Sequence, residues 1–318
     1  MLISIVVPCF NEQETLQTFF DTLNTELELC KKKFEHTKFE VIFVNDGSTD
    51  QTKQVIENIQ KNNPELVGFI EFSRNFGKEA ALTAGIKNAR GDLLIPIDAD
   101  LQHPPAVIKQ LIERYNRGGV DMVIAKRANR ETDSALYKKC ASLFYRLQNQ
   151  LTDVTVPDGA GDFRLISRKV ADSLSSLPEN RRFMKGLFAW VGFPSDYIEF
   201  EVAKRFSGKS HFTFRKLISL AVTGLLDFSA TPLRLSLFIG LTVSLCSFLY
   251  GFYILLKTLI FGIETPGYAS LIVVLLFIGG LILFSLGIVG EYIWRIYMEV
   301  KRRPAFIIEK KVDAKNTH

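Results

Sequence analysis

Two long apolar stretches in the second half of the chain constrain its fold more than any other feature. They cover residues 235–256 and 265–290, and neither contains an Asp, Glu, Lys or Arg. A helix of about 20 apolar residues crosses a bilayer core of roughly 30 Å. The alternative is a pair of buried core helices, but these seldom continue for more than about 20 residues without a charge. We therefore expect two membrane-spanning helices.

The residues before position 229 differ sharply from these stretches, because charged and apolar residues are mixed there as in a soluble protein. Over all 318 residues, 47% are hydrophobic and 23% are charged, and these averages hide the division. We expect a soluble domain (1–210), an interfacial amphipathic segment (211–232), a two-helix anchor (233–294) and a basic tail (295–318). Residues 213–228 have near-helical apolar spacing, which favours a helix in the membrane interface; packing against the soluble domain is an equal alternative.

Basic residues around the two stretches predict the orientation of the chain. They precede the first stretch and follow the second, namely Arg215, Lys216, Arg234, Arg295, Lys301, Arg302 and Arg303. The connecting loop holds only Lys257 and Glu264. Because positively charged flanks stay in the cytoplasm, we expect a multi-pass protein of the inner (plasma) membrane, with the soluble domain and both chain ends cytoplasmic.

The basic tail is expected to meet anionic lipid headgroups. Its cations include residues 301–303 and the pair Lys310 and Lys311, and each cation near such a surface contributes about 1 kcal/mol. Because these charges adjoin the predicted bilayer, nucleic-acid binding is not expected. The four cysteines lie far apart without a CxxC pair, so neither a disulfide framework nor a zinc site is expected.

The first 130 residues alternate between apolar runs and segments of helical spacing. The runs cover 3–7, 39–44, 66–72, 93–97 and 122–125, and the helical segments cover 12–34, 50–61, 78–89 and 104–115. This alternation predicts an α/β fold with a mostly parallel sheet, in which ligands bind beyond the carboxyl ends of the strands. Further along, residues 134–151, 167–174 and 183–190 are expected to be helical and 197–202 to form the last strand.

A pair of carboxylates follows the fourth apolar run. Asp98 and Asp100 are separated by one residue, and Gln102 can add a third oxygen. Hard oxygen ligands suit Mg²⁺ or Mn²⁺, so these three residues are the predicted metal ligands. A solvated acidic turn is the alternative. His103 next to them is expected to be a solvated loop histidine.

A second polar loop, residues 45–50, follows the second apolar run. Asp46 can accept hydrogen bonds from a nucleobase or ribose, as acidic residues beyond strands do in nucleotide-binding folds. A plain turn with Asp50 capping the next helix is the alternative. The sequence contains neither a GxGxxG segment nor a Walker A segment, which argues against dinucleotide oxidoreductases and P-loop ATPases.

Taken together, these loops resemble a known family. Residues 8–12 (Pro-Cys-Phe-Asn-Glu), 44–50, 73–78, 98–102 and 161–164 (Gly-Asp-Phe-Arg) are similar to the motifs of family 2 glycosyltransferases with the GT-A fold. More narrowly, they resemble polyprenyl-phosphate glycosyltransferases such as the dolichol-phosphate mannose synthases and the bactoprenol glucosyltransferases. Residues 266–270 and 290–292 in the predicted anchor are similar to the bactoprenol branch, so the resemblance covers nearly the whole chain.

The resemblance implies roles for individual residues. Nucleotide-sugar binding is implied for Pro8, Asn11, Glu12, Asp46, Ser48, Lys78 and Asp98, and metal binding for Asp98 and Asp100. A catalytic role is implied for Asp162. Residues matching Arg127 and the segment 205–209 approach the acceptor phosphate in such enzymes. On charge, the candidate cations for holding that phosphate are Arg127, Arg130, Arg205 and Lys209, and a solvated surface cation is the alternative for each.

The implied activity is inverting transfer of a sugar, first of all glucose from UDP-glucose, to undecaprenyl phosphate, for modification of a cell-envelope glycan. A lipid phosphate is largely dianionic at pH 7, so it needs cations to hold it more than it needs a base. Asp162 is therefore expected either to accept a proton or to orient a substrate. A processive polysaccharide synthase and a catalytically silent nucleotide-binding subunit are the alternatives.

Small residues in the second apolar stretch leave the oligomeric state open. They are Gly279, Gly280, Gly287 and Gly290. Such residues allow close helix contacts, hence a homo-oligomer, or relieve crowding within one chain.

Overall fold

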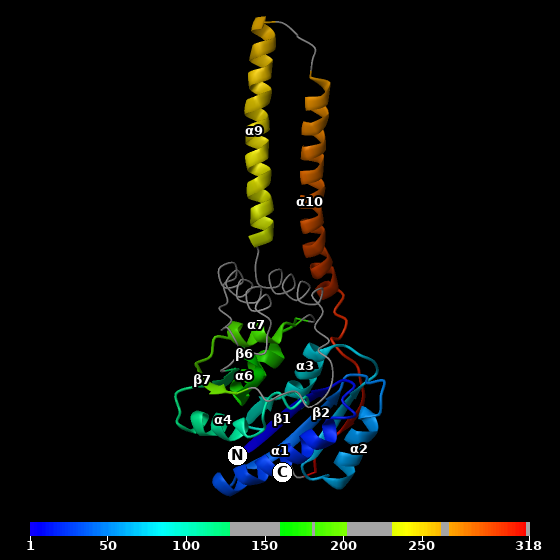
Figure 1. The fold of residues 1–318 in the computed structure, drawn as a ribbon, viewed down its shortest axis with the longest axis vertical. Helices are drawn as coiled ribbons and strands as arrows, with labels where there is room; N and C mark the ends of the chain where they lie inside the picture. The colour runs from blue at the N-terminus through cyan, green and yellow to red at the C-terminus, as the bar shows by residue number, and fades with distance from the viewer. Residues whose placement is uncertain (128–159, 180–181, 202–230, 262–266, 316–318) are drawn as a thin grey trace.

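The computed structural model describes residues 1–127, 160–179, 182–201, 231–261 and 267–315. An α/β domain carries two long helices that project from one end (Figure 1). Its sheet has the strand order β7-β5-β6-β4-β1-β2-β3-β8. The strands are β1 (Leu2–Cys9), β2 (Lys38–Asn45), β3 (Val67–Phe72), β4 (Leu93–Pro96), β5 (Met122–Arg127), β6 (Ala160–Ser167), β7 (Ser195–Phe200) and β8 (Ile308–Val312). The helices are α1 (Leu16–Lys33), α2 (Thr52–Asn62), α3 (Lys78–Asn88), α4 (Val107–Asn116), α6 (Arg168–Ser176), α7 (Met184–Trp190), α9 (Thr231–Phe261) and α10 (Tyr268–Val300).

The predicted parallel sheet is confirmed in its central strands. β4, β1, β2 and β3 are neighbours, and each pair among them is parallel. All residues of β3 and β4 are buried, as expected for strands covered on both faces. The five predicted strands and the four helices between them all occur. α2 begins at Thr52, so Asp50 is not its N-cap residue, although its carboxylate still accepts from the Thr52 N–H at 3.0 Å.

Helices cover both faces of the sheet and bury two apolar clusters. One cluster gathers side chains of α1, α2 and α4, and the other gathers side chains of α3, α6 and α7. Gly85 lets α3 lie directly on β1, because a Cβ there would sit 2.1 Å from Val6 Cγ1. Burial of the apolar side chains between the helices and the two faces of the sheet is the main interaction that stabilises this arrangement.

Two strands were not predicted. β6 runs antiparallel between β4 and β5, and β8 runs antiparallel along β3 at the opposite edge. In β8, Lys310 pairs with Glu57 at 2.7 Å, and Lys311 pairs with Asp313 just beyond the strand at 3.2 Å. These two lysines therefore belong to the edge of the sheet and not to an extended tail, and their contact with lipid headgroups stays a prediction.

The two projecting helices are long. At about 1.5 Å per residue, the 31 residues of α9 and the 33 of α10 each exceed the thickness of a bilayer core. Within the described residues, one segment, Phe277–Val300, is long and apolar enough to span a membrane, and α9 contains a shorter apolar segment, Phe238–Tyr250. The second predicted span is not confirmed. The predicted helices at 134–151 and 213–228 lie outside the described residues.

The glycines of α10 do not pack against another part of the described chain. Apart from the neighbouring backbone of α10 itself, no heavy atom of the described residues lies within 4 Å of a Cβ built at Gly279, Gly280, Gly287 or Gly290. Both alternatives for these residues, a homo-oligomer and relief of crowding within one chain, stay predictions.

Candidate active site

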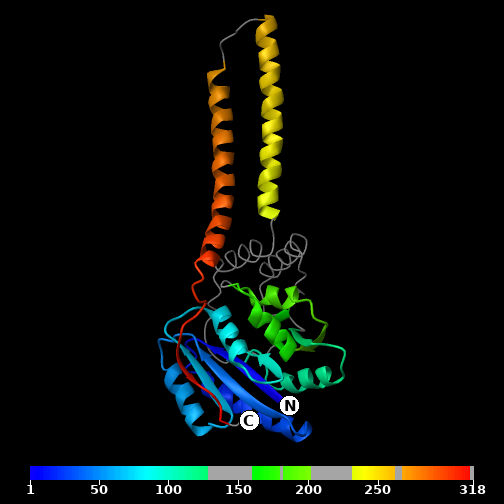
Figure 2. The same cartoon turned by 180° about the vertical axis from the view of Figure 1, so that it is seen from behind.

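The predicted site residues come together because three parallel strands end side by side. β4, β1 and β2 are adjacent, and their carboxyl ends open into the loops that carry Asp98, Glu12 and Asp46. β1 starts at the end of the domain that is farther from α9 and α10 and runs toward them (Figure 1, Figure 2). The loops at its carboxyl end therefore lie on the side of the sheet that faces the two long helices.

The loops after β1 and β2 are tied to each other. The Asn11 N–H donates to Ser48 Oγ at 3.1 Å, and the Thr49 N–H donates to Asn11 Oδ1 at 2.9 Å. The Glu12 N–H donates to Thr52 Oγ1 at 2.8 Å. Asn11 adopts a left-handed φ of 56°, which asparagine tolerates better than most residues. The structure thus brings Asn11, Glu12 and Ser48 together, next to Pro8 near the end of β1.

Asp46 holds the loop of residues 73–78. Its carboxylate accepts from the Phe76 N–H at 2.7 Å, the Gly77 N–H at 2.9 Å and Asn75 Nδ2 at 3.0 Å. Only 2% of Asp46 is exposed. Burial raises the pKa of Asp46, and the N–H groups of Phe76 and Gly77 oppose that rise. The residue organises its neighbours in this structure, and its predicted contact with a nucleobase or ribose remains a prediction.

Asp162 reaches the site because β6 is antiparallel to β4. Leu93 pairs with Ser167 and Leu94 pairs with Ile166. Continuing that register toward the carboxyl end of β4 sets Asp162 opposite Asp98. Because β6 is antiparallel to β4, the first residues of β6 lie at the same edge of the sheet as the last residues of the parallel strands.

The Lys78 ammonium lies between these two carboxylates. Lys78 Nζ is 2.7 Å from Asp98 Oδ1 and 3.1 Å from Asp162 Oδ2. Burial alone would raise the pKa of both carboxyls, but the Lys78 charge lowers the pKa of Asp98 and holds that of Asp162 well below its usual range. Desolvation disfavours the charged amine, yet Asp98 and Asp162 raise the pKa of Lys78. All three groups are therefore ionised at neutral pH.

Comparison with known proteins agrees with this arrangement. The model of glycosyl transferase family 2 matches residues 4–175, and the model of a GtrB C-terminal hairpin matches residues 231–296. The chain belongs to glycosyl transferase family 2. This confirms the resemblance seen in the motifs.

Two relatives of this family 2 chain extend over almost its full length. It is 47% identical to the SfII prophage-derived bactoprenol glucosyl transferase of Shigella flexneri, over 98% of both chains. It is 45% identical to a prophage bactoprenol glucosyl transferase homolog of Escherichia coli strain K12, over 98% of this chain and 99% of that one. Among solved structures, a mycobacterial protein of 19% identity matches 71% of this chain and 74% of its own, with a TM-score of 0.50. That likeness supports the α/β fold alone.

Two further charged residues of this family 2 chain border Asp162. The Glu79 carboxylate accepts from the Met184 N–H at 2.9 Å. Burial and the charge of Asp162 raise the pKa of Glu79 to about 7. Lys185, half-buried on α7, lowers the pKa of both Asp162 and Glu79. The sequence analysis missed Glu79 and Lys185, because only the packing of α7 against α3 and β6 brings them here.

Two other side chains near the site are buried. His103, expected to be solvated, is 5% exposed and packs on Phe163 at 5.3 Å between ring centroids. Its Nδ1 lies 3.8 Å from Asp98 Oδ2. Arg164 is 3% exposed, and its Cζ lies 4.0 Å from the centroid of the Phe188 ring. Burial lowers the pKa of Arg164 to about 10. The Gly-Asp-Phe-Arg motif thus supplies the carboxylate of Asp162 to the site, and the next two residues, Phe163 and Arg164, pack beside it in the core.

The predicted metal ligands fit a divalent ion that is shared with a substrate. Asp100 Oδ1 accepts from the Gln102 N–H at 3.0 Å, so both lie in one tight turn around Leu101, whose φ is 60°. Asp162 Oδ1 is buried and has no hydrogen-bond partner among the described residues. In the described part of the chain, no group of three or more His, Cys, Asp or Glu is arranged to hold an ion. Mg²⁺ is usually bound by one or two carboxylates plus substrate phosphates, which is what Asp98 and Asp100 can offer.

The predicted acceptor-binding cations are largely outside the described residues. Arg127 ends β5, where its backbone pairs with Phe200 of β7. Arg130, Arg205 and Lys209 fall in segments that the structure does not describe. Their predicted role stays a prediction.

Proposed function

We propose that this chain transfers a glucosyl group from UDP-glucose to polyprenyl phosphate, with inversion at the anomeric carbon. The observation that carries the proposal is the full-length similarity to proteins named bactoprenol glucosyl transferase, over 98% of both chains in the first case. The cluster of Lys78, Asp98 and Asp162 at the carboxyl rim of the sheet supports it, since this is where parallel α/β sheets bind ligands.

The acceptor phosphate is the nucleophile of the proposed reaction. It is largely dianionic at neutral pH, so its attack on the sugar needs no strong base. It does need positive charge nearby, because it must approach an anionic sugar nucleotide. We assign this holding role to Arg127, Arg130, Arg205 and Lys209. Arginine forks bind phosphate bidentately, which also orients the attacking oxygen.

We assign Asp162 an orienting role in preference to proton abstraction. One of its oxygens is held by Lys78, and the other is buried without a partner among the described residues. We assign this acceptor to a hydrogen bond from a sugar hydroxyl, because a buried acceptor needs a donor. A carboxylate whose pKa is held below its usual range is also a weak base at neutral pH.

Asp98 and Asp100, with Gln102, are the residues that would hold Mg²⁺ or Mn²⁺. When bound, such an ion neutralises the charge of the departing nucleoside diphosphate. The Lys78 ammonium lies beside Asp98 at 2.7 Å and adds a positive charge to the same place. Asn11, Glu12, Ser48 and Pro8 remain the proposed nucleotide contacts on the neighbouring loops.

We propose two membrane crossings, by α9 and α10, with both chain ends in the cytoplasm. The argument is that β8 pairs with β3, so the chain must return after α10 to the side where the catalytic domain lies. An odd number of crossings would separate β8 from its sheet. The proposed parts are the catalytic domain (1–210), the interfacial segment (211–232), the anchor (233–294) and the tail (295–318), with β8 added to the catalytic domain.

The proposed function is tested with membranes that contain the protein and a panel of labelled sugar nucleotides. Label from UDP-glucose is expected in the organic extract and, on thin-layer chromatography, as a single lipid-linked sugar. Asp98→Asn should lower this transfer by about 100-fold or more, the size typical of losing one charge-stabilising group. A chelator should do the same. Asp172→Asn is the matched control, because this exposed carboxylate pairs with Arg168 on α6, away from the site.

The outcomes of this assay separate the alternatives. Label from a different sugar nucleotide would correct the donor but keep the reaction. A polymeric product would favour a processive synthase, although the Gln-x-x-Arg-Trp segment of those enzymes does not occur in this sequence. No transfer from any donor by folded protein would leave a silent nucleotide-binding subunit, and full activity in chelator would remove the metal from the proposal.

A further inference from the structure

The segment that follows α10 returns to the catalytic domain and touches the loop beside the active site. α10 ends at Val300, and β8 begins at Ile308. Between them, the ring of Phe306 stacks on Phe72, the last residue of β3, with centroids 5.1 Å apart and an interplanar angle of 12°. Phe72 is 2% exposed, so this stack is part of the core. The loop of residues 73–78 starts directly after it.

The contact continues from Phe72 into that loop. Phe76 packs edge-on against Phe72, with centroids 5.7 Å apart and an angle of 89°. The Ser73 N–H donates to the Ile307 carbonyl at 3.2 Å. The loop is therefore held by the segment after α10 through one backbone hydrogen bond and through a row of three aromatic rings.

The same loop carries groups of the active site. The Phe76 and Gly77 N–H groups donate to Asp46, and Lys78 reaches Asp98 and Asp162. Gly77 has a φ of 98°, a backbone conformation that glycine adopts readily and L side chains rarely adopt. On its other side the loop is held by Asp46 and by the ion pairs of Lys78 with Asp98 and Asp162.

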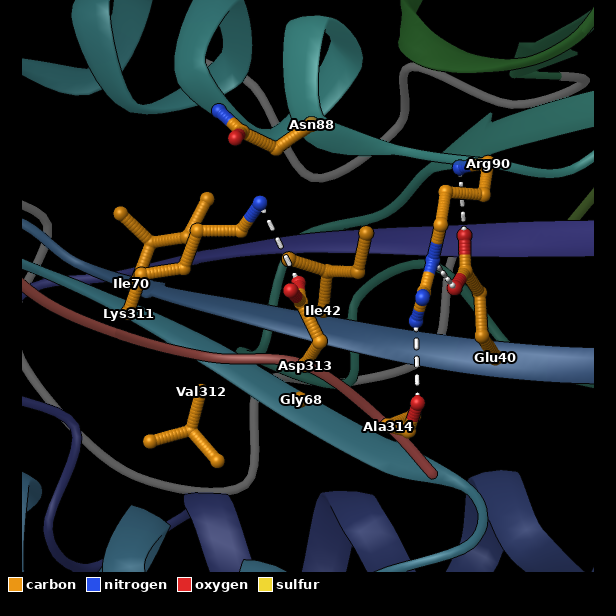
Figure 3. A pocket seen from close by; sticks show the side chains of 10 residues that line it. All are labelled: Glu40, Ile42, Gly68, Ile70, Asn88, Arg90, Lys311, Val312, Asp313 and Ala314. Carbon is orange, nitrogen blue, oxygen red and sulfur yellow. Dashed lines mark hydrogen bonds and ion pairs between the residues drawn. The ribbon is translucent and has the colours of Figure 1, made fainter. Parts of the chain in front are cut away.

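β8 has attachments of its own, away from this loop. Arg90 donates to the Ala314 carbonyl at 3.0 Å while its backbone N–H donates to Glu40 at 2.7 Å (Figure 3). The Lys315 N–H donates to the Pro64 carbonyl at 2.9 Å. The strand is therefore expected to stay docked when the Phe306 ring is removed, and this makes the ring testable by itself.

We propose that Phe306 is a positioning residue of the active site. Its ring, on the segment after α10, holds the loop of residues 73–78 in the arrangement that sets the Lys78 ammonium between Asp98 and Asp162. Five residues separate the end of α10 from Phe306, so the end of a membrane-anchor helix is linked directly to the sugar-nucleotide site. The kinetic part of the test rests on the proposed function, whereas the structural part does not.

The test uses the full chain in detergent and compares Phe306→Ala, Phe306→Tyr and Lys310→Ala. Lys310→Ala is the matched control, because it removes the ion pair of β8 with Glu57 and touches no residue of the loop. Hydrogen–deuterium exchange is measured on peptides that cover residues 73–78. We expect exchange to rise roughly 2- to 10-fold in Phe306→Ala, the range that follows from losing one aromatic pair. Phe306→Tyr should restore protection, and the β8 peptide should keep it in both variants.

Kinetics with the sugar nucleotide then separate positioning from folding. We expect Phe306→Ala to lower kcat by roughly 10-fold while the thermal midpoint of the domain stays within a few degrees, because a misplaced loop costs rate more than stability. Unchanged exchange at 73–78 in Phe306→Ala, or an equal rise in Lys310→Ala, would overturn the proposal. If the wild-type protein transfers no sugar but exchange responds as expected, the proposed function fails and the positioning role stands.

Discussion

At the scale of single residues, Gly47 shows how closely the site loops are packed. It has a φ of 60°, and a Cβ built on it would lie 2.3 Å from the carbonyl carbon of Arg74 and 2.5 Å from the Asn75 nitrogen. These are backbone atoms, which cannot rotate away. The loop after β2 and the loop of residues 73–78 are thus in direct contact, and the same contact lets Asp46 reach the N–H groups of Phe76 and Gly77.

Replacing this glycine should damage both stability and activity. Gly47→Ala combines a left-handed alanine, which costs about 1–2 kcal/mol, with overpacking, which costs about 1–3 kcal/mol. Gly118→Ala is the control, since Gly118 also has a positive φ of 79° but no neighbouring atom within 4 Å among the described residues. Thermal unfolding should show a clearly larger loss for Gly47→Ala, and only that variant should lose sugar transfer. Equal losses would mean that the two loops are not held in this contact.

Site residues could be predicted where a local sequence pattern marks them, and not where tertiary contacts alone bring them to the site. Asp98, Asp100 and Asp46 were found because they follow apolar strands, and the chain order of a parallel sheet places such residues at one rim. The hydrogen bonds from backbone N–H groups to Asp46 cannot be predicted from the sequence, because one of the donors, Phe76, lies 30 residues further along the chain. The bridge from Lys78 to Asp162 is likewise a product of the tertiary structure and leaves no trace in local spacing.

At the scale of elements, β6 combines a site carboxylate with a buried cation. Arg164→Ala should destabilise the protein by roughly 2–4 kcal/mol, because it removes the contact with Phe188 and leaves a cavity. Arg164→Met should lose less, since it fills the volume without a charge that burial disfavours. Denaturant or thermal unfolding gives the order of stabilities. If Arg164→Met is as unstable as Arg164→Ala, the charge and not the packing holds β6 against α7.

The strands that were predicted and those that were missed differ in composition. β1 to β5 carry apolar runs, because strands of a covered parallel sheet are buried on both faces. β6 carries Asp162 and Arg164 among its buried residues, so it shows neither an apolar run nor an alternating pattern. β8 is an exposed edge strand with two lysines, and charge is typical of sheet edges. The position of β8 is explained by its pairing with the outer edge of β3.

At the scale of the whole molecule, the start of β1 and the end of β8 both lie in the part of the domain that is away from α9 and α10 (Figure 1, Figure 2). The Lys38 N–H bonds to the Met1 carbonyl at 2.9 Å, and Lys315 bonds to Pro64, so both ends belong to the same sheet domain. The long helices leave from the other end. A chain built in this way must cross a membrane an even number of times if α10 crosses it at all.

This argument predicts the outcome of reporter fusions. A fluorescent protein fused after His318 should fluoresce, because the proposed topology keeps the C-terminus in the cytoplasm with the sheet that holds β8. Alkaline phosphatase inserted near Gly267, between α9 and α10, should be active, because it is exported only if α9 crosses the bilayer. The exchanged pair of fusions, phosphatase at the end and fluorescent protein in the loop, is the control and should be silent. An external C-terminus would contradict the pairing of β8 with β3 in the membrane-bound protein. A cytoplasmic loop at Gly267 would instead mean that the two helices do not cross, in which case the apolar surface of Phe277–Val300 must be covered in another way.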